Sequence, residues 1–242
     1  MKTPSCMNRK VSVILPTLNE KGNIGPLIDA IHKELSGFDH EIIVVDDNST
    51  DCTYEAVCDL RYPFVKAIHR KEDPSYGKSF RCGLESAEGE IFVLMGSDFN
   101  HHPKYLPFML KAIDYYDCVM GSRFLYGGKG AGPSRHLLSW AFNLFLRLLT
   151  DGRITDNLFG YIVIRKEVIE QLNYDDIFWG FGEFSIRLLY YLQREGGMVL
   201  QVPMTVGERL AGVGNRRFIR NFIKYTLATV TLVFKEGRCL KP

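Results

Sequence analysis

The sequence lacks the features that define several protein classes. Its six cysteines form no Cys-x-x-Cys pair, have no histidines at zinc-site spacing and follow no secretory signal, so we expect a reducing, cytosolic compartment. No run of residues reaches the roughly 18 to 20 uncharged apolar positions that span a bilayer. The absence of a Gly-x-Gly-x-x-Gly motif argues against a dinucleotide cofactor. With 30 Lys+Arg against 28 Asp+Glu, the net charge of +2 gives no global field that would attract nucleic acid.

What the sequence does have is a regular alternation of strand and helix patterns. A chain of 242 residues, 46% of them hydrophobic, can bury a sizeable core, and its length favours one domain. The patterns predict strands over residues 11–15, 41–45, 64–68 and 91–95, and helices over residues 24–35, 53–60 and 77–87. Asn23 is the expected N-cap of the first helix. This order predicts an α/β, Rossmann-like fold with a mainly parallel central sheet flanked by helices.

The second half of the sequence is less regular. A glycine-rich loop over residues 127–132 leads into an apolar helix over 136–149. Further patterns predict a strand over 161–164, a helix over 183–194, a strand over 198–202 and an amphipathic segment over 218–234. We expect a main domain over residues 1–217 and a C-terminal amphipathic, interfacial segment over 218–242.

Two aspartates directly follow one of the expected buried strands. Ligands of parallel sheets bind beyond the carboxyl ends of the strands, where Asp46 and Asp47 would lie. A turn is one explanation, because Asp-Asp-Asn-Ser-Thr-Asp is good turn and N-cap chemistry. The other is that the two carboxylates accept hydrogen bonds from a nucleobase N–H or a ribose hydroxyl. The sequence leaves both open.

A second polar cluster follows the strand over residues 91–95. Asp98 and Asn100 are hard oxygen ligands two positions apart, so in an extended segment they would project to the same side and could share one Mg²⁺ or Mn²⁺ with diphosphate oxygens. The spacing alone is a weak indication. His101 and His102 fit loop or helix-start positions better than metal ligands.

At this point the sequence resembles the family 2 glycosyltransferases of the GT-A fold, a nucleotide-diphospho-sugar transferase fold. Within that family it is most similar to dolichyl-phosphate mannose synthases and related polyprenyl-phosphate glycosyltransferases. The blocks that carry the resemblance occur in order over residues 11 to 217: Val-Ile-Leu-Pro-Thr-Leu-Asn-Glu at 13–20, Val-Val-Asp-Asp-Asn-Ser-Thr-Asp at 44–51, Gly77 with Gly83 and Gly89, Ser97-Asp98 before His101-His102-Pro103, and Gly121-Ser122-Arg123.

The resemblance implies roles for the matching positions. The nucleoside and diphosphate of a nucleotide sugar would be held along the strand ends, the acceptor phosphate at the start of the apolar helix, and Arg209 would belong to a donor-closing loop. The implied sets are Pro16, Thr17, Leu18, Glu20, Asp46, Asp47, Gly77, Lys78, Ser97, Asp98 and Arg209 for the nucleotide sugar, Arg123, Arg135 and Ser139 for the acceptor phosphate, Asp98 and Asn100 for a divalent metal, and Asp98, Arg123 and Glu183 for catalysis.

The sequence departs from the family pattern at two places. The usual metal motif is Asp-x-Asp, but Gly96 stands where the first carboxylate is expected, so Mg²⁺ or Mn²⁺ should be held weakly. The closing loop usually ends in Ser-Lys, whereas this chain has Gly214-Asn215 followed by Arg216 and Arg217. Those arginines could replace the lysine.

The expected reaction is an inverting transfer of a hexose from a nucleotide sugar to a polyprenyl, dolichyl-type phosphate at the cytoplasmic face of a membrane. Mannose and GDP-mannose are the favoured sugar and donor, with a UDP-linked sugar as the other possibility. Arginine forks would offset the repulsion between the two phosphate groups. Glu183, in Gly-Phe-Gly-Glu-Phe, could orient a sugar hydroxyl or act as the base for an alcohol acceptor. The alternatives are a family 2 enzyme that uses a saccharide or other alcohol, and a non-catalytic sugar-nucleotide-binding subunit.

Two apolar segments suggest where a lipid acceptor would be met. The helix over 136–149 is apolar almost all round, so it is either a core helix or one that lies on a membrane. The segment over 218–234 mixes basic and apolar residues as an interfacial helix does. We therefore expect a peripheral membrane protein on the cytoplasmic side, with a membrane subunit or a homo-oligomer as further partners.

Overall fold

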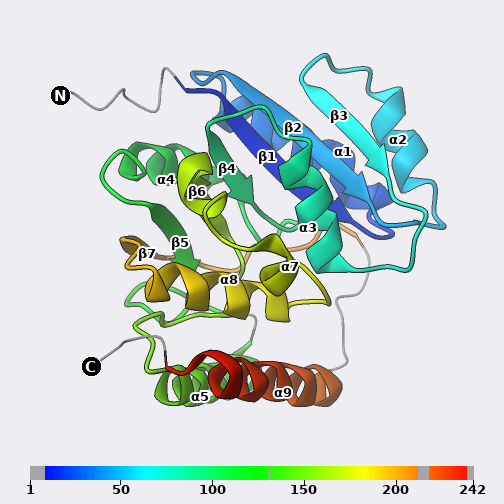
Figure 1. Ribbon diagram of the computed structural model, residues 1–242. Helices are drawn as coiled ribbons and strands as arrows, with labels where there is room; N and C mark the ends of the chain where they lie inside the picture. Colours follow the sequence, from blue (N-terminus) through cyan, green and yellow to red (C-terminus); the bar gives the residue numbers. More distant parts are fainter. Residues whose placement is uncertain (1–8, 131, 212–217, 239–242) are drawn as a thin grey trace.

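The computed structural model describes residues 9–130, 132–211 and 218–238. Its centre is a seven-stranded sheet with the strand order β3-β2-β1-β4-β6-β5-β7 (Figure 1). Strands β3, β2, β1 and β4 are parallel to one another, and β5 is parallel to β7. Strand β6 runs antiparallel to both of its neighbours, β4 and β5. The expected α/β fold with a mainly parallel sheet is confirmed.

The elements follow the predicted alternation, with several short helices added. In chain order they are β1 (Val11–Thr17), α1 (Lys21–Glu34), β2 (His40–Asp46), α2 (Thr53–Asp59), β3 (Val65–His69), α3 (Tyr76–Glu85), β4 (Ile91–Leu94), the 3₁₀ helix η2 (Pro103–Tyr105), α4 (Leu106–Ala112), β5 (Cys118–Ser122), α5 (Pro133–Thr150), β6 (Ile162–Arg165), α6 (Lys166–Ile169), α7 (Tyr174–Ile177), α8 (Glu183–Arg194), β7 (Val199–Pro203) and α9 (Phe218–Glu236).

The sheet is buried on both faces, which explains why its central strands read as continuous apolar runs. Every residue of β1 is buried, and its side chains alternate between two cores. Val11, Val13 and Leu15 pack in one core with α1 and α4, whereas Ile14 packs in the other with α3 and α8. This packing fixes the carboxyl ends of β1, β2 and β4 beside one another.

The expected start of the first helix is wrong. Helix α1 begins at Lys21, and its N-cap residue is Glu20, not Asn23. Asn23 is instead buried in the first turn, where its side chain bonds to the backbone of Leu210 and Ala211. Asparagine is a common N-cap residue, but the Asn23 side chain is used here for hydrogen bonds to a segment that is distant in the sequence.

Helices α5 and α9 form a separate layer. They lie side by side at the bottom of Figure 1 and pack against each other, and α9 also packs against α8. Within α5 the buried face carries Ser139, Phe142, Asn143 and Leu146. Most of the remaining large apolar side chains of the two helices are exposed, namely Leu137, Leu138, Trp140, Leu144, Phe145 and Leu148 of α5 and Phe222, Ile223, Leu227 and Phe234 of α9.

This arrangement excludes the core-helix interpretation of residues 136–149, because the more apolar side of α5 faces away from the protein. None of the helices formed by residues 9–130, 132–211 and 218–238 is long and apolar enough to cross a bilayer. The boundary expected at residue 217 stays a prediction, and α9 packs on the main domain through Tyr225 and Leu232.

Candidate active site

The three predicted strand ends meet at one edge of the sheet. The Asp47 amide donates to the Thr17 carbonyl at 2.8 Å, which joins the end of β2 to that of β1. The Ser97 hydroxyl donates to the Pro16 carbonyl, also at 2.8 Å, which joins the segment after β4 to β1. Leu18 is 45% exposed beside them. The structure therefore brings together residues that sequence reasoning assigned to nucleotide-sugar binding.

Asp46 and Asp47 are both buried and both hydrogen-bonded. Asp46 accepts from the Ser49 amide at 3.0 Å, which is the expected turn bond. Asp47 accepts from the Ser75 amide at 2.6 Å and pairs with the Arg70 guanidinium. Burial raises the pKa of the Asp47 carboxyl, and Arg70 acts against that shift. The turn and the ligand interpretations are therefore compatible, because each carboxylate oxygen can accept a second hydrogen bond.

Arg70 was missed by the sequence reasoning. It lies directly after β3, 8% exposed, and its guanidinium also bonds to Ser79 at 3.1 Å and Glu72 at 3.0 Å. The position was a usable signal, since Arg70 follows a strand of the parallel sheet just as Asp47 does. Arg70 positions Asp47 and balances its charge.

The start of α3 comes next to this cluster. Ser75 caps the helix by accepting from the Lys78 amide, and Lys78 itself is exposed. Gly77 donates to the Gly180 carbonyl at 3.1 Å, and a Cβ at Gly77 would lie within 2.8 Å of the Trp179 backbone. Gly77 is therefore required for the close approach of α3 to the segment before α8.

Asp98 and Asn100 are neighbours, but for a different reason than expected. The segment is a turn, not an extended strand, because Phe99 between them adopts a left-handed backbone with φ of 61°. The Asn100 side chain donates to Asp98 Oδ2 at 2.6 Å, and its amide donates to Asp98 Oδ1 at 3.2 Å. A bulky residue at positive φ is uncommon and marks a conformation that its surroundings enforce.

His101 is hydrogen-bonded to the start of that turn. Its Nδ1 accepts from the Gly96 amide at 2.8 Å and its Nε2 lies 2.6 Å from the Phe159 carbonyl, so the neutral ring carries its proton on Nε2. Burial lowers the pKa of His101 to about 4, which favours this neutral form. His101 is a positioning residue for the Gly96–Asn100 segment, and His102 caps η2.

Arg209 reaches across from the segment after β7. Its guanidinium donates to Asp98 Oδ2 at 2.5 Å and to Glu20 Oε1 at 2.6 Å. Burial is the main cause that raises the pKa of Glu20, and its hydrogen bonds to Asn23 and Arg209 oppose that shift. Asn23 holds the same segment by accepting from the Leu210 and Ala211 amides at 3.1 and 2.9 Å. Gly214, Asn215, Arg216 and Arg217, where the sequence departs from the family pattern, lie outside the described residues.

The residues expected to bind the acceptor phosphate divide into two kinds. Arg123, directly after β5, forms a bidentate pair with Asp156 at 2.7 and 2.8 Å and lies 3.4 Å from the Ser139 hydroxyl. Asp156 is fully buried and was missed, because nothing in its loop sequence marks it. Arg135, in the first turn of α5, is exposed and makes no hydrogen bond or ion pair within the described part of the chain.

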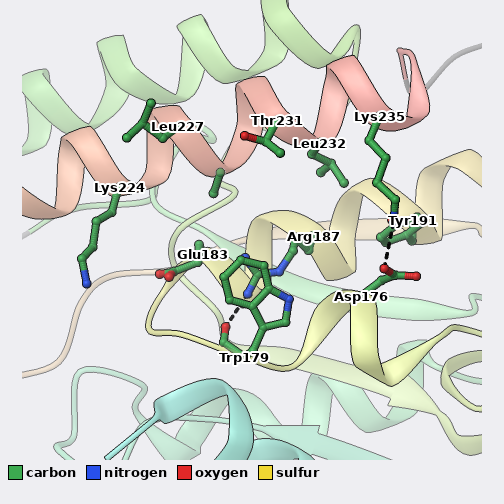
Figure 2. A pocket seen from close by; sticks show the side chains of 11 residues that line it. Asp176, Trp179, Glu183, Arg187, Tyr191, Lys224, Leu227, Thr231, Leu232 and Lys235 are labelled. Carbon is green, nitrogen blue, oxygen red and sulfur yellow. Dashed lines mark hydrogen bonds and ion pairs between the residues drawn. The ribbon is translucent and has the colours of Figure 1, made fainter.

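Glu183 lies apart from these clusters, in a pocket between α8 and α9 (Figure 2). The pocket encloses about 460 Å³, and Trp179, Arg187, Lys224 and Leu227 also line it. Glu183 is 6% exposed and its Oε2 has no partner among the described residues, and the same holds for Arg187 Nη1. Burial lowers the pKa of Arg187 to about 10, and the Trp179 ring stacks 3.7 Å from its guanidinium carbon.

Comparison with known proteins identifies the class to which this arrangement belongs. Residues 12–172 match the model of the family described as glycosyl transferase family 2. A dolichol-phosphate mannosyltransferase of Pyrococcus furiosus is 33% identical over 219 residues, which is 84% of this chain and 58% of that protein. An undecaprenyl-phosphate mannosyltransferase of Micrococcus luteus is 33% identical over 217 residues, covering 84% of this chain and 86% of that protein.

Solved structures show the same fold. Glucosyl-3-phosphoglycerate synthase from Mycobacterium tuberculosis, in complex with Mn²⁺, UDP and glucosyl-3-phosphoglycerate, superposes with a TM-score of 0.73 at 23% identity, covering 96% of this chain and 81% of that one. The chain belongs to glycosyl transferase family 2 and has the GT-A fold. It is a glycosyltransferase, as the sequence predicted.

Proposed function

We propose that this glycosyltransferase transfers a hexose, with mannose from GDP-mannose as the favoured case, to a polyprenyl phosphate at a membrane surface. The observation that carries the proposal is the position of Arg135 in the first turn of α5 and of Arg123 beside Ser139 of the same helix, whose apolar side is exposed. Phosphate-binding cations beside an open apolar surface suit an acceptor that is part phosphate and part lipid. The names of the two relatives that are 33% identical support the same acceptor class.

The chemistry needs positioning more than proton transfer. An acceptor phosphate oxygen forms the new bond to the anomeric carbon as the bond from that carbon to the donor diphosphate breaks, and the nucleoside diphosphate leaves. Arg123, Arg135 and Ser139 would bind the acceptor phosphate through charge-assisted hydrogen bonds. Attack opposite to the leaving group inverts the anomeric configuration. No general base is required, because the attacking oxygen is already ionised near neutral pH.

The donor would occupy the edge formed by the three strand ends. Pro16, Thr17, Leu18 and Glu20 of the β1 end and Asp46 and Asp47 of the β2 end would face the nucleoside. Gly77, Lys78, Ser97, Asp98 and Arg209 would lie toward the sugar and diphosphate. Two hydrogen bonds that bring these groups together support the assignment, one from Ser97 to the Pro16 carbonyl and one from Arg209 to Asp98.

A divalent metal fits this site only together with the donor. Within the described residues no group of three or more His, Cys, Asp or Glu side chains could hold a metal ion. Asp98 and Asn100 offer two oxygen ligands, which suits Mg²⁺ or Mn²⁺ when phosphates supply the rest. When bound, the metal would supply positive charge that stabilises the leaving diphosphate. A set of only two protein ligands supports the expectation from Gly96 that the metal is held weakly.

The same layer would place the enzyme at a membrane. The exposed apolar residues of α5 and α9 belong to two helices that lie side by side and pack against each other (Figure 1). The exposed apolar residues and the proposed lipid acceptor support a peripheral position on the cytoplasmic face, where nucleotide sugars would be available. A membrane subunit or a second copy of the chain could add to the attachment.

The direct experiment is a matrix of GDP- and UDP-linked radiolabelled sugars against dolichyl and undecaprenyl phosphate. Product that extracts into organic solvent, sensitive to mild acid as glycosyl phosphates are, identifies donor and acceptor together. Asp98→Ala serves as the inactive control. If no lipid phosphate accepts a sugar from any donor that the protein binds, the acceptor assignment is wrong.

One observation favours the alternative acceptor class, a saccharide or other alcohol. Glu183 is buried with an unpaired Oε2 at the wall of a pocket, so it could take a proton from a hydroxyl group. Glu183→Gln should abolish transfer to an alcohol but leave transfer to a lipid phosphate above half of the wild-type rate. A comparable loss with both acceptors would assign Glu183 to orienting the donor sugar.

A further inference from the structure

The Arg209 guanidinium is hydrogen-bonded to the Asp98 carboxylate, which a metal ion would need as a ligand. Asp98 Oδ2 accepts from Arg209 at 2.5 Å and from the Asn100 side chain at 2.6 Å, and Asp98 Oδ1 accepts from the Asn100 amide. In a site with two aspartates, one carboxylate could hold the arginine and the other the ion. Here Gly96 removes that choice, since Asp98 is the sole carboxylate in residues 96–100.

We propose that Arg209 is a tethered cation that neutralises Asp98 while no donor is bound, and that divalent metal binding requires its release from Asp98. The inference rests on the proposed function only in taking Asp98 as the metal ligand. A guanidinium and a metal ion carry like charge and need the same oxygen, so each weakens the binding of the other by the same factor.

Residues 207–211 are held by backbone hydrogen bonds that do not involve the Arg209 side chain. Arg209 can therefore leave Asp98 while these residues stay in place. Asn23 holds Leu210 and Ala211 through backbone hydrogen bonds, and Gly207 donates to the Asn100 carbonyl at 2.9 Å. The second arm of the guanidinium bonds to Glu20, whose side chain is 12% exposed, so the backbone of the segment does not depend on the Asp98 contact. A rotation of the Arg209 side chain is therefore enough to free Asp98.

The diphosphate of a donor gives Arg209 another anion to bind. When a nucleoside diphosphate enters, Arg209 can exchange the Asp98 carboxylate for phosphate oxygens, which it binds as a bidentate fork. The freed Asp98 and the phosphates then provide the oxygen ligands for the ion. Metal and nucleotide are thus expected to bind cooperatively, with the metal binding poorly by itself.

The test measures Mn²⁺ binding to the full-length protein without nucleotide, by the loss of the free-ion signal in electron paramagnetic resonance. Arg209→Gln should bind Mn²⁺ at least about tenfold more tightly than wild type, because a charge-assisted pair no longer has to be broken. Arg209→Lys, which keeps the charge, should remain close to wild type. Lys104→Gln removes one positive charge from the helix that follows this segment and should change nothing.

Gly96→Asp is the positive control for the site itself. A Cβ at position 96 would lie 3.4 Å from Asp98 Oδ1, an ordinary contact, so a side chain can begin at this position beside Asp98. It should tighten Mn²⁺ binding and thereby show that Asp98 faces the ion. The cooperativity is then read from the same titration with GDP or UDP present, where the difference between wild type and Arg209→Gln should shrink.

The outcomes separate this inference from the proposed function. If Gly96→Asp tightens Mn²⁺ binding but Arg209→Gln leaves it unchanged or weakens it, Arg209 does not compete with the ion and the inference is wrong. If neither variant binds Mn²⁺, Asp98 is not the metal ligand and the inference also fails. Neither result concerns the acceptor, which the transfer assay tests. Thermal melting confirms that each variant is folded before it is titrated.

Discussion

The donor edge of the sheet and the α5–α9 layer use their side chains in opposite ways. At the donor edge nearly every charged group has a partner: Asp47 has Arg70, and Arg209 has both Asp98 and Glu20. In the α5–α9 layer, large apolar side chains are exposed, with Leu148 at 70% and Phe234 at 88%, and Arg135 has no described partner. The charges of the donor edge are paired within the protein, whereas the α5–α9 layer exposes apolar side chains and a cation to solvent.

The difference indicates two kinds of ligand. If a nucleotide sugar binds at the donor edge as proposed, its phosphates and hydroxyls would replace protein partners, so binding there would exchange existing hydrogen bonds for new ones. A lipid surface that meets α5 and α9 removes apolar area from water without breaking anything. Arg123 lies between the two regions. Its guanidinium carbon is 5.3 Å from the centre of the ring of Phe159, whose backbone carbonyl faces His101, and the guanidinium also lies beside Ser139 of α5.

The largest effect should come from the donor edge. Asp98→Ala removes the only carboxylate of residues 96–100, which we propose face the diphosphate and the metal. We therefore expect transfer to fall below a tenth of the wild-type rate, which corresponds to a barrier increase of more than ~1.4 kcal/mol. Asp175→Ala, which removes an exposed carboxylate of α7, should leave the rate unchanged. Initial rates with saturating donor check both variants. Activity above a tenth in Asp98→Ala would show that the leaving group is stabilised elsewhere.

Replacement of Arg123, which lies between the two regions, should reduce both the stability of the protein and its binding of the acceptor. Arg123→Ala leaves the fully buried Asp156 carboxylate without its bidentate partner, which we expect to cost about 3 kcal/mol of unfolding free energy. Urea denaturation followed by circular dichroism measures this loss. A double change that also converts Asp156 to Asn should recover part of it. An unaltered denaturation midpoint in Arg123→Ala would mean that the pair contributes no net stability.

The exposed arginine should affect binding alone. Arg135→Ala removes a charge-assisted contact worth roughly 1.5 to 3 kcal/mol, so the KM for the lipid phosphate should rise by about tenfold or more. Its denaturation midpoint should match wild type, because Arg135 has no partner to lose within the described residues. Calorimetry should show unchanged nucleotide-sugar affinity. An equal loss of donor affinity would place Arg135 at the donor edge instead.

The smallest effects should come from single positions of the apolar surface. Trp140→Glu and Phe234→Glu should each weaken co-sedimentation with anionic liposomes severalfold, and added salt should weaken it further, since each cation near the leaflet contributes on the order of 1 kcal/mol. Tyr115→Glu, at an exposed aromatic position before β5, is the matched control. Full liposome binding by both variants would leave α5 and α9 as a surface for a protein partner.

Much of the fold was predictable because its signals are local. The apolar runs of β1, β2 and β4 and the helical spacing after them required no knowledge of distant residues, and the polar strand ends followed from the parallel order. The start of α1 was wrong because Asn23 bonds to Leu210 and Ala211, which are far away in sequence. The extended geometry expected around Asp98 was wrong because Phe99 takes a left-handed turn that a helix or strand pattern does not encode.

The sequence by itself determined the α/β class, the family and the residue types available at each strand end, because periodicity and short motifs are properties of neighbouring positions. Only the tertiary structure decided which charges meet. It paired Arg123 with Asp156, Asp47 with Arg70, and Arg209 with Asp98, and it turned the apolar side of α5 away from the core. Each of these depends on contacts between segments that the chain brings together only when the sheet and its helices have packed.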